Sequence, residues 1–239
     1  MFFGRFPPAA RELVLLTVLY TAYRLGRLVS AGRVGEAREN ARELWRLERA
    51  LGLPGEDALQ RLVLDHDLIV RAANAYYATV HFPAIIVFLL WMYLRRPVHY
   101  LWIRRVLTVL TAAGLLLHVT VPLAPPRLVE DFGMTDTGVL HGQSPYGGSA
   151  VDAFSNQYAA MPSLHVGWAL LIAIGLIAAT RARLRLLWLL HPLATLLVVV
   201  VTAHHYWLDA LVAVLLLALA LVLLRPPRPV HPSAGTGDG

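Results

Sequence analysis

Two stretches of this chain combine histidine with residues that could assist it in chemistry. The later stretch, TAHHYWLD, places His205 four residues before Asp209, so a helix would put both side chains on one face. A carboxylate there can fix the tautomer of an imidazole and stabilise its protonated form. His205 is therefore a candidate nucleophile or general base, although the same pair could be a purely structural hydrogen bond.

The earlier stretch, QYAAMPSLHVGW, has a histidine at the expected start of a helix. Proline favours the first helical turn, so Pro162 predicts that a helix begins here, with Ser163 and His165 beside its free N–H groups. Such groups bind anions, including phosphate. The same residues could be no more than a helix cap. The combination with the later His-Asp pair and with Arg127 is what favours a functional site.

The elements that must carry these residues are apolar. Of the 239 residues, 57% are hydrophobic and 15% are charged, which is typical of an integral membrane protein rather than a soluble domain. Because lipid offers no hydrogen bonds to an exposed backbone, helices are the expected elements. The sequence predicts an all-α, polytopic membrane protein with a bundle of about six transmembrane helices. The apolar runs are residues 13–29, 75–94, 100–122, 164–180, 184–201 and 206–224.

These runs suggest three parts of the chain. Residues 1–74 would hold the first transmembrane helix and an interfacial amphipathic segment, residues 75–224 a catalytic transmembrane core, and residues 225–239 a disordered cytoplasmic tail. The segment GEARENARELWRLERAL indicates either a helix lying in the membrane interface or a solvated connecting helix. Its apolar residues, set among Glu and Arg, are Ala41, Leu44, Trp45, Leu47 and Leu51.

The placement of arginine predicts the orientation. The loops at 95–105 and 181–185 and the exit at 225–228 are strongly basic, whereas the loop at 123–161 is mainly acidic. The positive-inside rule puts the basic loops in the cytoplasm, so we expect a multi-pass cell-membrane protein whose active site faces the extracytoplasmic side. The polar residues expected to converge near that side are Tyr77, His81, His118, Arg127, Ser163, His165, His204, His205 and Asp209.

Charge and cysteine content exclude several classes of function. The formal net charge is +6 and all 21 basic residues are arginine. They cluster between apolar runs, which favours contact with anionic lipid over nucleic-acid binding. Because the chain has no cysteine, it has neither disulfides nor thiolate metal sites. The start, MFFGRFPPAARE, lacks the pattern of a removable signal peptide.

The motifs PSLHVG and HHYWLD resemble the second and third motifs of the type 2 phosphatidic acid phosphatase superfamily. PLAPPR, residues 122–127, resembles the proline-rich motif of its inositol-phosphotransferase branch, which includes inositol phosphorylceramide synthase. The resemblance covers roughly the last half of the chain. It implies a cofactor-free enzyme acting on membrane lipid phosphate through a phosphohistidine. His205 would then be the nucleophile, Asp209 would orient it, and His165 would protonate the leaving oxygen.

The chain departs from the superfamily pattern at two phosphate ligands. The first motif of the wider superfamily begins with lysine, which is absent here, and Val199 stands where its third motif has arginine. Arg127 is the best substitute as a substrate-binding residue. Further candidates are Ser163, His204 and His81.

Two other functions fit the same residues. Zinc could be bound by His165, His204, His205 and Asp209, but an anion-binding helix start and a nearby arginine would repel a cation. A proton-coupled transporter could also use buried His, Asp and Arg, although the internal repeats common in that class are missing. The sequence does not choose between water and a polyol such as inositol as acceptor.

Overall fold

The computed structural model describes residues 32–141, 158–180 and 183–226, together with Val14, Thr17, Val18 and Thr21. Every regular element in this part of the chain is helical. The predicted helix at 13–29 lies almost entirely outside the described residues, and so does the tail from 227 onward. The helices are α2 (Val34–Ala50), α3 (Glu56–Leu64), α4 (Asp67–Thr79), α5 (His81–Arg95), α6 (Pro97–Thr120), α7 (Thr137–Leu140), α9 (Leu164–Ala179), α10 (Leu190–Val201) and α11 (Trp207–Leu223), with the short 3-10 helices η1 (Pro126–Leu128), η2 (Glu130–Phe132) and η3 (Arg185–Leu189).

The long apolar runs form helices close to their expected bounds. Helices α6, α9 and α11, and η3 continued by α10, correspond to four of the predicted segments. By length and composition α6 could cross a membrane, whereas α9, α11 and η3–α10 are apolar but shorter. An all-α fold is therefore confirmed for the described residues, and the number of transmembrane spans stays a prediction.

The segment predicted as one helix at 75–94 is divided into α4 and α5. The two helices meet at Val80 with a bend of 46°. Taken together as one bent segment, they are long and apolar enough to cross a membrane. Pro83 explains the break, because it has no N–H to donate to the Thr79 carbonyl and its ring would crowd that group. The bend turns the first residue of α5, His81, towards the bundle.

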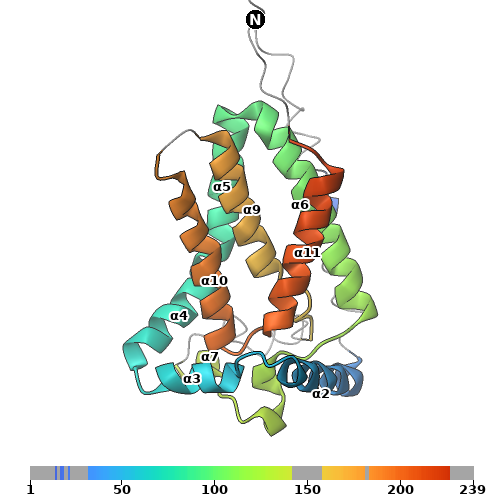
Figure 1. The fold of residues 1–239 in the computed structure, drawn as a ribbon, viewed down its shortest axis with the longest axis vertical. Helices are drawn as coiled ribbons and strands as arrows, with labels where there is room; N and C mark the ends of the chain where they lie inside the picture. Colours follow the sequence, from blue (N-terminus) through green and yellow to red (C-terminus); the bar gives the residue numbers. More distant parts are fainter. Residues whose placement is uncertain are drawn as a thin grey trace, which may run out of the picture.

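Helix α9 is the centre of the bundle. It contacts α5, α6, α10 and α11, which stand around it in Figure 1. Small residues allow this close approach: a Cβ atom on Gly175 would lie 2.6 Å from Cζ of Phe88 and 3.0 Å from Cδ1 of Ile103. The neighbouring helices pack their large apolar side chains into the space that α9 leaves.

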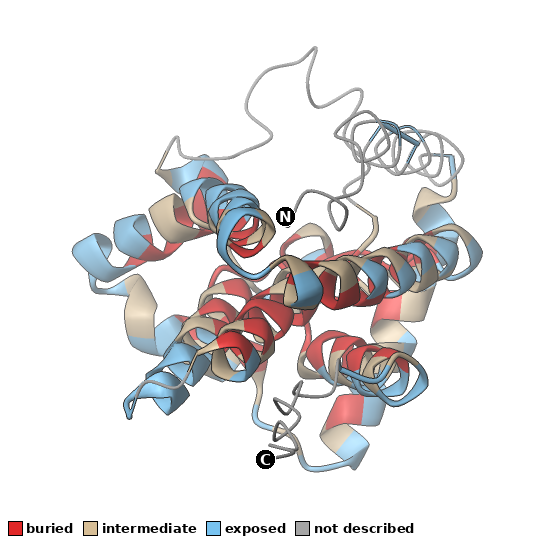
Figure 2. Ribbon diagram, turned by 90° about the horizontal axis from the view of Figure 1, so that it is seen from above, coloured by how far each residue is buried: buried red, intermediate tan, exposed pale blue. Residues whose placement is uncertain are grey.

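The bundle is apolar both inside and outside. Figure 2 shows the buried residues on the helix faces that point inward and the exposed ones facing out. The core includes Ile103, Leu110, Leu171 and Leu217, none of which is exposed. The outward faces of the same helices also carry large apolar side chains, which include Leu90, Leu116, Leu197, Leu215 and Val222.

Helices α2 and α3 lie across the end of the bundle where α9 and α11 begin (Figure 1). Helix α2 is the predicted amphipathic helix, but the face it buries contains Ala37, Ala41 and Glu48, while Leu47 and Leu51 are exposed. The small alanines let the backbone of α2 approach the chain after α6, where Ala124 N donates to the Ala37 carbonyl at 3.0 Å. The two helices thus cover the end where the polar residues gather.

Candidate active site

Residues from five separated segments meet at the end of the bundle that α2 and α3 cover. His81 opens α5, His118 lies in the last turn of α6, and His165 lies in the first turn of α9. The turn between α10 and α11 supplies His204 and His205. The remaining two residues, Arg127 in η1 and Asp209 in the first turn of α11, are buried.

The geometry around His205 defines its tautomer. Its Nδ1 atom lies 2.9 Å from the Ala160 carbonyl oxygen and 3.2 Å from Asp209 Oδ2. Both partners accept hydrogen bonds, so Nδ1 carries the hydrogen and Nε2 keeps a free lone pair. The pair forms across the start of α11 rather than along a helix face, because His205 precedes the N-cap residue Tyr206. Asp209 is held in turn by the Tyr206 N–H, 3.0 Å from Oδ2.

Burial keeps His205 neutral. Desolvation lowers the pKa of His205 from 6.5 to about 3, the hydrogen bond to the Ala160 carbonyl opposes this, and the positive charge of Arg127 adds to it. At neutral pH the imidazole therefore presents the Nε2 lone pair without competition from a proton. An uncharged imidazole with a free nitrogen can act as a nucleophile or as a base.

The end of α10 explains why two histidines reach the site together. Ala203 has a positive φ of 56°, Ala203 N donates to the Val200 carbonyl, and His204 N donates to the Val199 carbonyl. This is the Schellman arrangement, which reverses the chain at a helix C-terminus and usually places glycine where Ala203 stands. His205 N shares the same carbonyl of Val199, so the turn fixes both backbone positions.

His165 lies at the centre of a group of closely spaced rings. Its centroid is 5.6 Å from the ring of His205, 4.2 Å from the ring of His81 and 4.8 Å from the ring of Tyr77. The His81 ring also stacks on Trp168 at 5.2 Å. The bend at Val80 is what brings His81 into this group.

Arg127 and His204 line the same region. The Arg127 backbone N–H donates to the Ala203 carbonyl, which attaches η1 to the histidine turn, and the guanidinium Nε is 3.1 Å from Asp136 Oδ2. His204 is buried, and desolvation followed by the charge of Arg127 lowers its pKa well below the ordinary value. The structure therefore brings a buried cation close to both histidines of the turn.

Ser163 is the N-cap of α9, which begins at Leu164 as the apolar run at 164–180 predicted. Its Oγ accepts from Val166 N at 3.5 Å, and its backbone N–H donates to the Asp209 carbonyl at 3.0 Å. Ser163 thus attaches the start of α9 to the start of α11, beside the His205–Asp209 pair.

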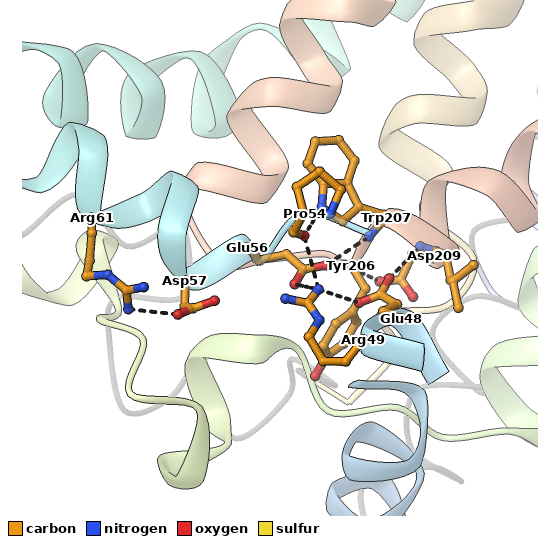
Figure 3. Close-up of polar contacts among 10 residues, drawn as sticks. Glu48, Arg49, Pro54, Glu56, Asp57, Arg61, Tyr206, Trp207 and Asp209 are labelled. Carbon is orange, nitrogen blue, oxygen red and sulfur yellow. Dashed lines mark hydrogen bonds and ion pairs between the residues drawn. The ribbon is translucent and has the colours of Figure 1, made fainter. Parts of the chain in front are cut away.

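Three acidic residues near the site were missed by the sequence analysis. Glu48 and Glu56 reach the start of α11 from α2 and α3, as Figure 3 shows, and Asp136 pairs with Arg127. One signal was available for Glu48. It follows Ala41 by seven residues, so it falls on the same helix face as the small residues that allow close packing.

The donors proposed for zinc do not form a metal centre. Among the described residues no group of three or more His, Asp or Glu side chains is arranged to hold a metal ion. The Nδ1 atoms of His204 and His205 are occupied by Thr202 Oγ1 and by the Ala160 and Asp209 oxygens, respectively.

Comparison with known proteins identifies the family of this chain. The family model described as the PAP2 superfamily matches residues 42–223, from within α2 to the last residue of α11. No curated protein and no solved structure matches the chain. The matched region contains every residue of the site described above.

Proposed function

Because this chain belongs to the PAP2 superfamily and is a phosphatase-type enzyme, we propose that it cleaves phosphate esters of membrane lipids through a phosphohistidine on His205. The single observation that carries this proposal is the hydrogen bonding of His205. Its Nδ1 is committed to Ala160 and Asp209, which leaves Nε2 as a neutral nucleophile.

In the first step the Nε2 lone pair of His205 attacks phosphorus. A P–N bond forms, the ester P–O bond breaks, and the leaving oxygen takes a proton from the imidazolium of His165. The negative charge of bound phosphate favours that imidazolium. The positive charge that develops on the His205 ring is balanced by Asp209, which lies 3.2 Å from its Nδ1.

In the second step an acceptor hydroxyl attacks the phosphohistidine. The acceptor gives its proton to the now neutral His165, a new P–O bond forms, and the P–N bond to His205 breaks. Both histidines then return to their starting protonation states. The 5.6 Å between their ring centroids is short enough for both imidazoles to reach one bound phosphate group, which supports their action on the same substrate.

The phosphate oxygens need positive or donor groups in place of the lysine and arginine that the superfamily motifs would supply. Arg127 is the strongest of these because it is buried and carries a full charge. His81 and His204 flank His165 and Tyr77 and can donate from ring nitrogens, and the Ser163 hydroxyl lies at the start of α9. Val199, at the position of the superfamily arginine, contributes only its carbonyl to the histidine turn.

The protein is proposed to span the cell membrane several times. Support comes from the apolar outward faces of α5, α6, α10 and α11, which a soluble protein would bury. The end of the bundle opposite the site carries Arg95, Arg96, Arg183 and Arg185, whereas the arginines of α2 and α3 at the site end are roughly balanced by Glu and Asp. By the positive-inside rule that end is cytoplasmic, so the site opens on the extracytoplasmic side.

The acceptor is water in a hydrolase and a polyol such as inositol in a head-group transferase. The likeness of residues 122–127 to the proline-rich motif of the inositol-phosphotransferase branch favours the transferase. The position of Arg127 at the end of this stretch, with its N–H donating to the Ala203 carbonyl beside His204, supports a role of the motif in phosphate binding.

The test is turnover of radiolabelled phosphatidic acid and radiolabelled phosphatidylinositol by the purified protein, with and without inositol. We expect release of labelled phosphate when water is the acceptor or of a labelled inositol phosphate when inositol is, and a loss of at least about 10³-fold in His205→Ala. His99→Ala, at the opposite end of the bundle, is the matched control and should keep its activity. Alkaline denaturation during turnover should leave labelled phosphate on the peptide that contains His205. Unchanged turnover in His205→Ala would refute the proposal.

A further inference from the structure

The start of α11 is held by carboxyl groups from three parts of the chain. The first N–H groups of a helix have no partner within it, and a negative charge placed there also interacts favourably with the helix dipole. Here each of three successive N–H groups donates to an oxygen of a different carboxyl group (Figure 3). The contacts are Tyr206 N to Asp209 Oδ2 at 3.0 Å, Trp207 N to Glu56 Oε1 at 3.4 Å and Leu208 N to Glu48 Oε1 at 2.8 Å.

Two of these carboxyl groups come from helices outside the bundle. Glu48 lies near the end of α2 and Glu56 is the first residue of α3, and neither side chain is exposed. The turn between them is attached to α11 as well, since Trp207 Nε1 donates to the Pro54 carbonyl at 2.9 Å. The start of α11 is therefore fixed from outside the bundle by a segment that lies about 150 residues earlier in the chain.

The charges in this cluster do not balance if every carboxyl is ionised. Arg49 Nη2 lies 2.9 Å from Glu56 Oε2 and 3.9 Å from Glu48 Oε2, and Asp209 is a third carboxyl nearby. Buried carboxyls that share one cation are strongly disfavoured as a group of anions. Desolvation, and next the neighbouring Glu56, raise the pKa of Glu48 from 4.5 to about 9, so Glu48 keeps its proton at neutral pH.

A simple helix cap would not require this arrangement. One Ser, Thr, Asp or Asn at the N-cap usually satisfies the start of a helix, whereas two buried glutamates carry a desolvation cost. What the glutamates hold is the peptide between His205 and Asp209, because the contacted N–H groups belong to Trp207 and Leu208. A shift of this peptide would change the distance between the imidazole and the carboxylate.

We propose that Glu48 and Glu56 are positioning residues for the His205–Asp209 pair. They hold the start of α11 so that Asp209 stays against Nδ1 of His205 and Nε2 keeps its direction. This inference rests on the function proposed above. It assigns to α2 and α3, which contribute no group to the reaction, a direct effect on the rate of the chemical step.

The same cluster gives the reaction an alkaline limit. Four ionisable groups face Glu48. They are Arg49 from α2, Glu56 from α3, and Tyr206 and Asp209 at the start of α11. Loss of the Glu48 proton would place a new negative charge beside Asp209 and push the two elements apart. We therefore expect kcat to fall as pH rises through about 9.

The experiment compares kcat and KM between pH 6 and pH 10 for the wild type, Glu48→Ala, Glu48→Gln, Glu56→Gln and a control, Glu43→Gln. Glu43 is exposed on the same helix. Glu48→Ala should lower kcat about 10- to 100-fold while KM changes by less than about threefold, because a misplaced nucleophile slows chemistry more than binding. The neutral amide of Glu48→Gln can still accept from Leu208 N, so it should restore most of kcat and remove the fall near pH 9.

The possible failures can be told apart. A kcat that is unchanged in Glu48→Ala, in protein whose turnover depends on His205, would overturn the positioning role and leave the proposed function intact. Turnover that survives His205→Ala would overturn the proposed function instead. If Glu48→Ala does not fold, the pH profile of Glu48→Gln decides, and an alkaline limb identical to the wild type would contradict the inference. A lower fraction of active protein with normal kcat per active site would also contradict it.

Discussion

The guanidinium Nε of Arg127 lies 3.1 Å from Oδ2 of Asp136, and both residues sit beside the candidate active site. The other oxygen of Asp136 accepts from Val139 N at 3.1 Å and so caps α7. Helix α7 is fixed in turn by the paired hydrogen bonds of Asn74 with Thr137. Arg127 is thus held by a carboxylate on an anchored segment, and a phosphate that binds Arg127 must share it with Asp136.

Asp136→Asn should therefore bind inorganic phosphate more tightly. The amide still caps α7, but the negative charge that competes with phosphate is removed, and we expect the inhibition constant of phosphate to fall about tenfold. The measurement is competitive inhibition of lipid phosphate turnover. Asp131→Asn is the control, because Asp131 forms an exposed ion pair with Arg42. Equal or weaker inhibition in Asp136→Asn would show that the carboxylate does not compete.

Glu48 should make the folded protein less stable at alkaline pH. The raised pKa means that Glu48 stays protonated in the folded state up to about 9, whereas it ionises near 4.5 in the unfolded chain. Between pH 7 and 9 the free energy of unfolding should therefore fall by about 1.4 kcal/mol per pH unit. Glu48→Gln has no proton to lose and should lack this slope. Thermal midpoints in detergent would measure the difference, and parallel curves for wild type and variant would contradict it.

Gly175 should tolerate no side chain. A methyl group there would meet Phe88 at 2.6 Å, and we expect Gly175→Ala to destabilise the protein by about 1 to 3 kcal/mol. Gly35, in the first turn of α2, has nothing within 4 Å of the same methyl position. Gly35→Ala should therefore stabilise by up to about 1 kcal/mol through helix propensity alone. Equal effects of the two substitutions in chemical unfolding would count against the packing of α9.

The orientation can be read by labelling single cysteines, since the natural chain has none. Glu43 is exposed on α2 at the site end, and Arg183 is exposed at the other end of the bundle. A membrane-impermeant maleimide should modify Glu43→Cys in intact cells, and Arg183→Cys only after the cells are permeabilised. The reverse pattern would place the site in the cytoplasm.

The main helices could be predicted from sequence because long apolar runs leave few alternatives. The ends of α9 and α11 fell within one residue of the prediction, and the spacing of His205 and Asp209 indicated their contact. Other features depend on contacts between distant segments. The bend at Val80 lies inside one uninterrupted apolar run, and only the packing of α5 against α9 shows that it delivers His81 to His165.

The glutamates at the start of α11 illustrate the same limit. In the sequence Glu48 is one of several acidic residues on a charged helix, and only its spacing of seven residues from Ala41 separates it from Glu43. The difference arises when α2 presses its alanine face onto the chain after α6, which buries Glu48 and leaves Glu43 exposed. A helical pattern predicts that a face is buried, but the partner of that face is a tertiary property.

The shortness of α9 and α11 has a consequence for how a lipid would reach His205. With 16 and 17 residues they are about 24 and 26 Å long, less than the roughly 30 Å of hydrocarbon in a typical bilayer. Helices shorter than the hydrocarbon layer are matched by local thinning of the membrane around them. The phosphates of the surrounding lipids would then lie closer to the level of the proposed catalytic imidazoles, His165 and His205, without leaving the leaflet.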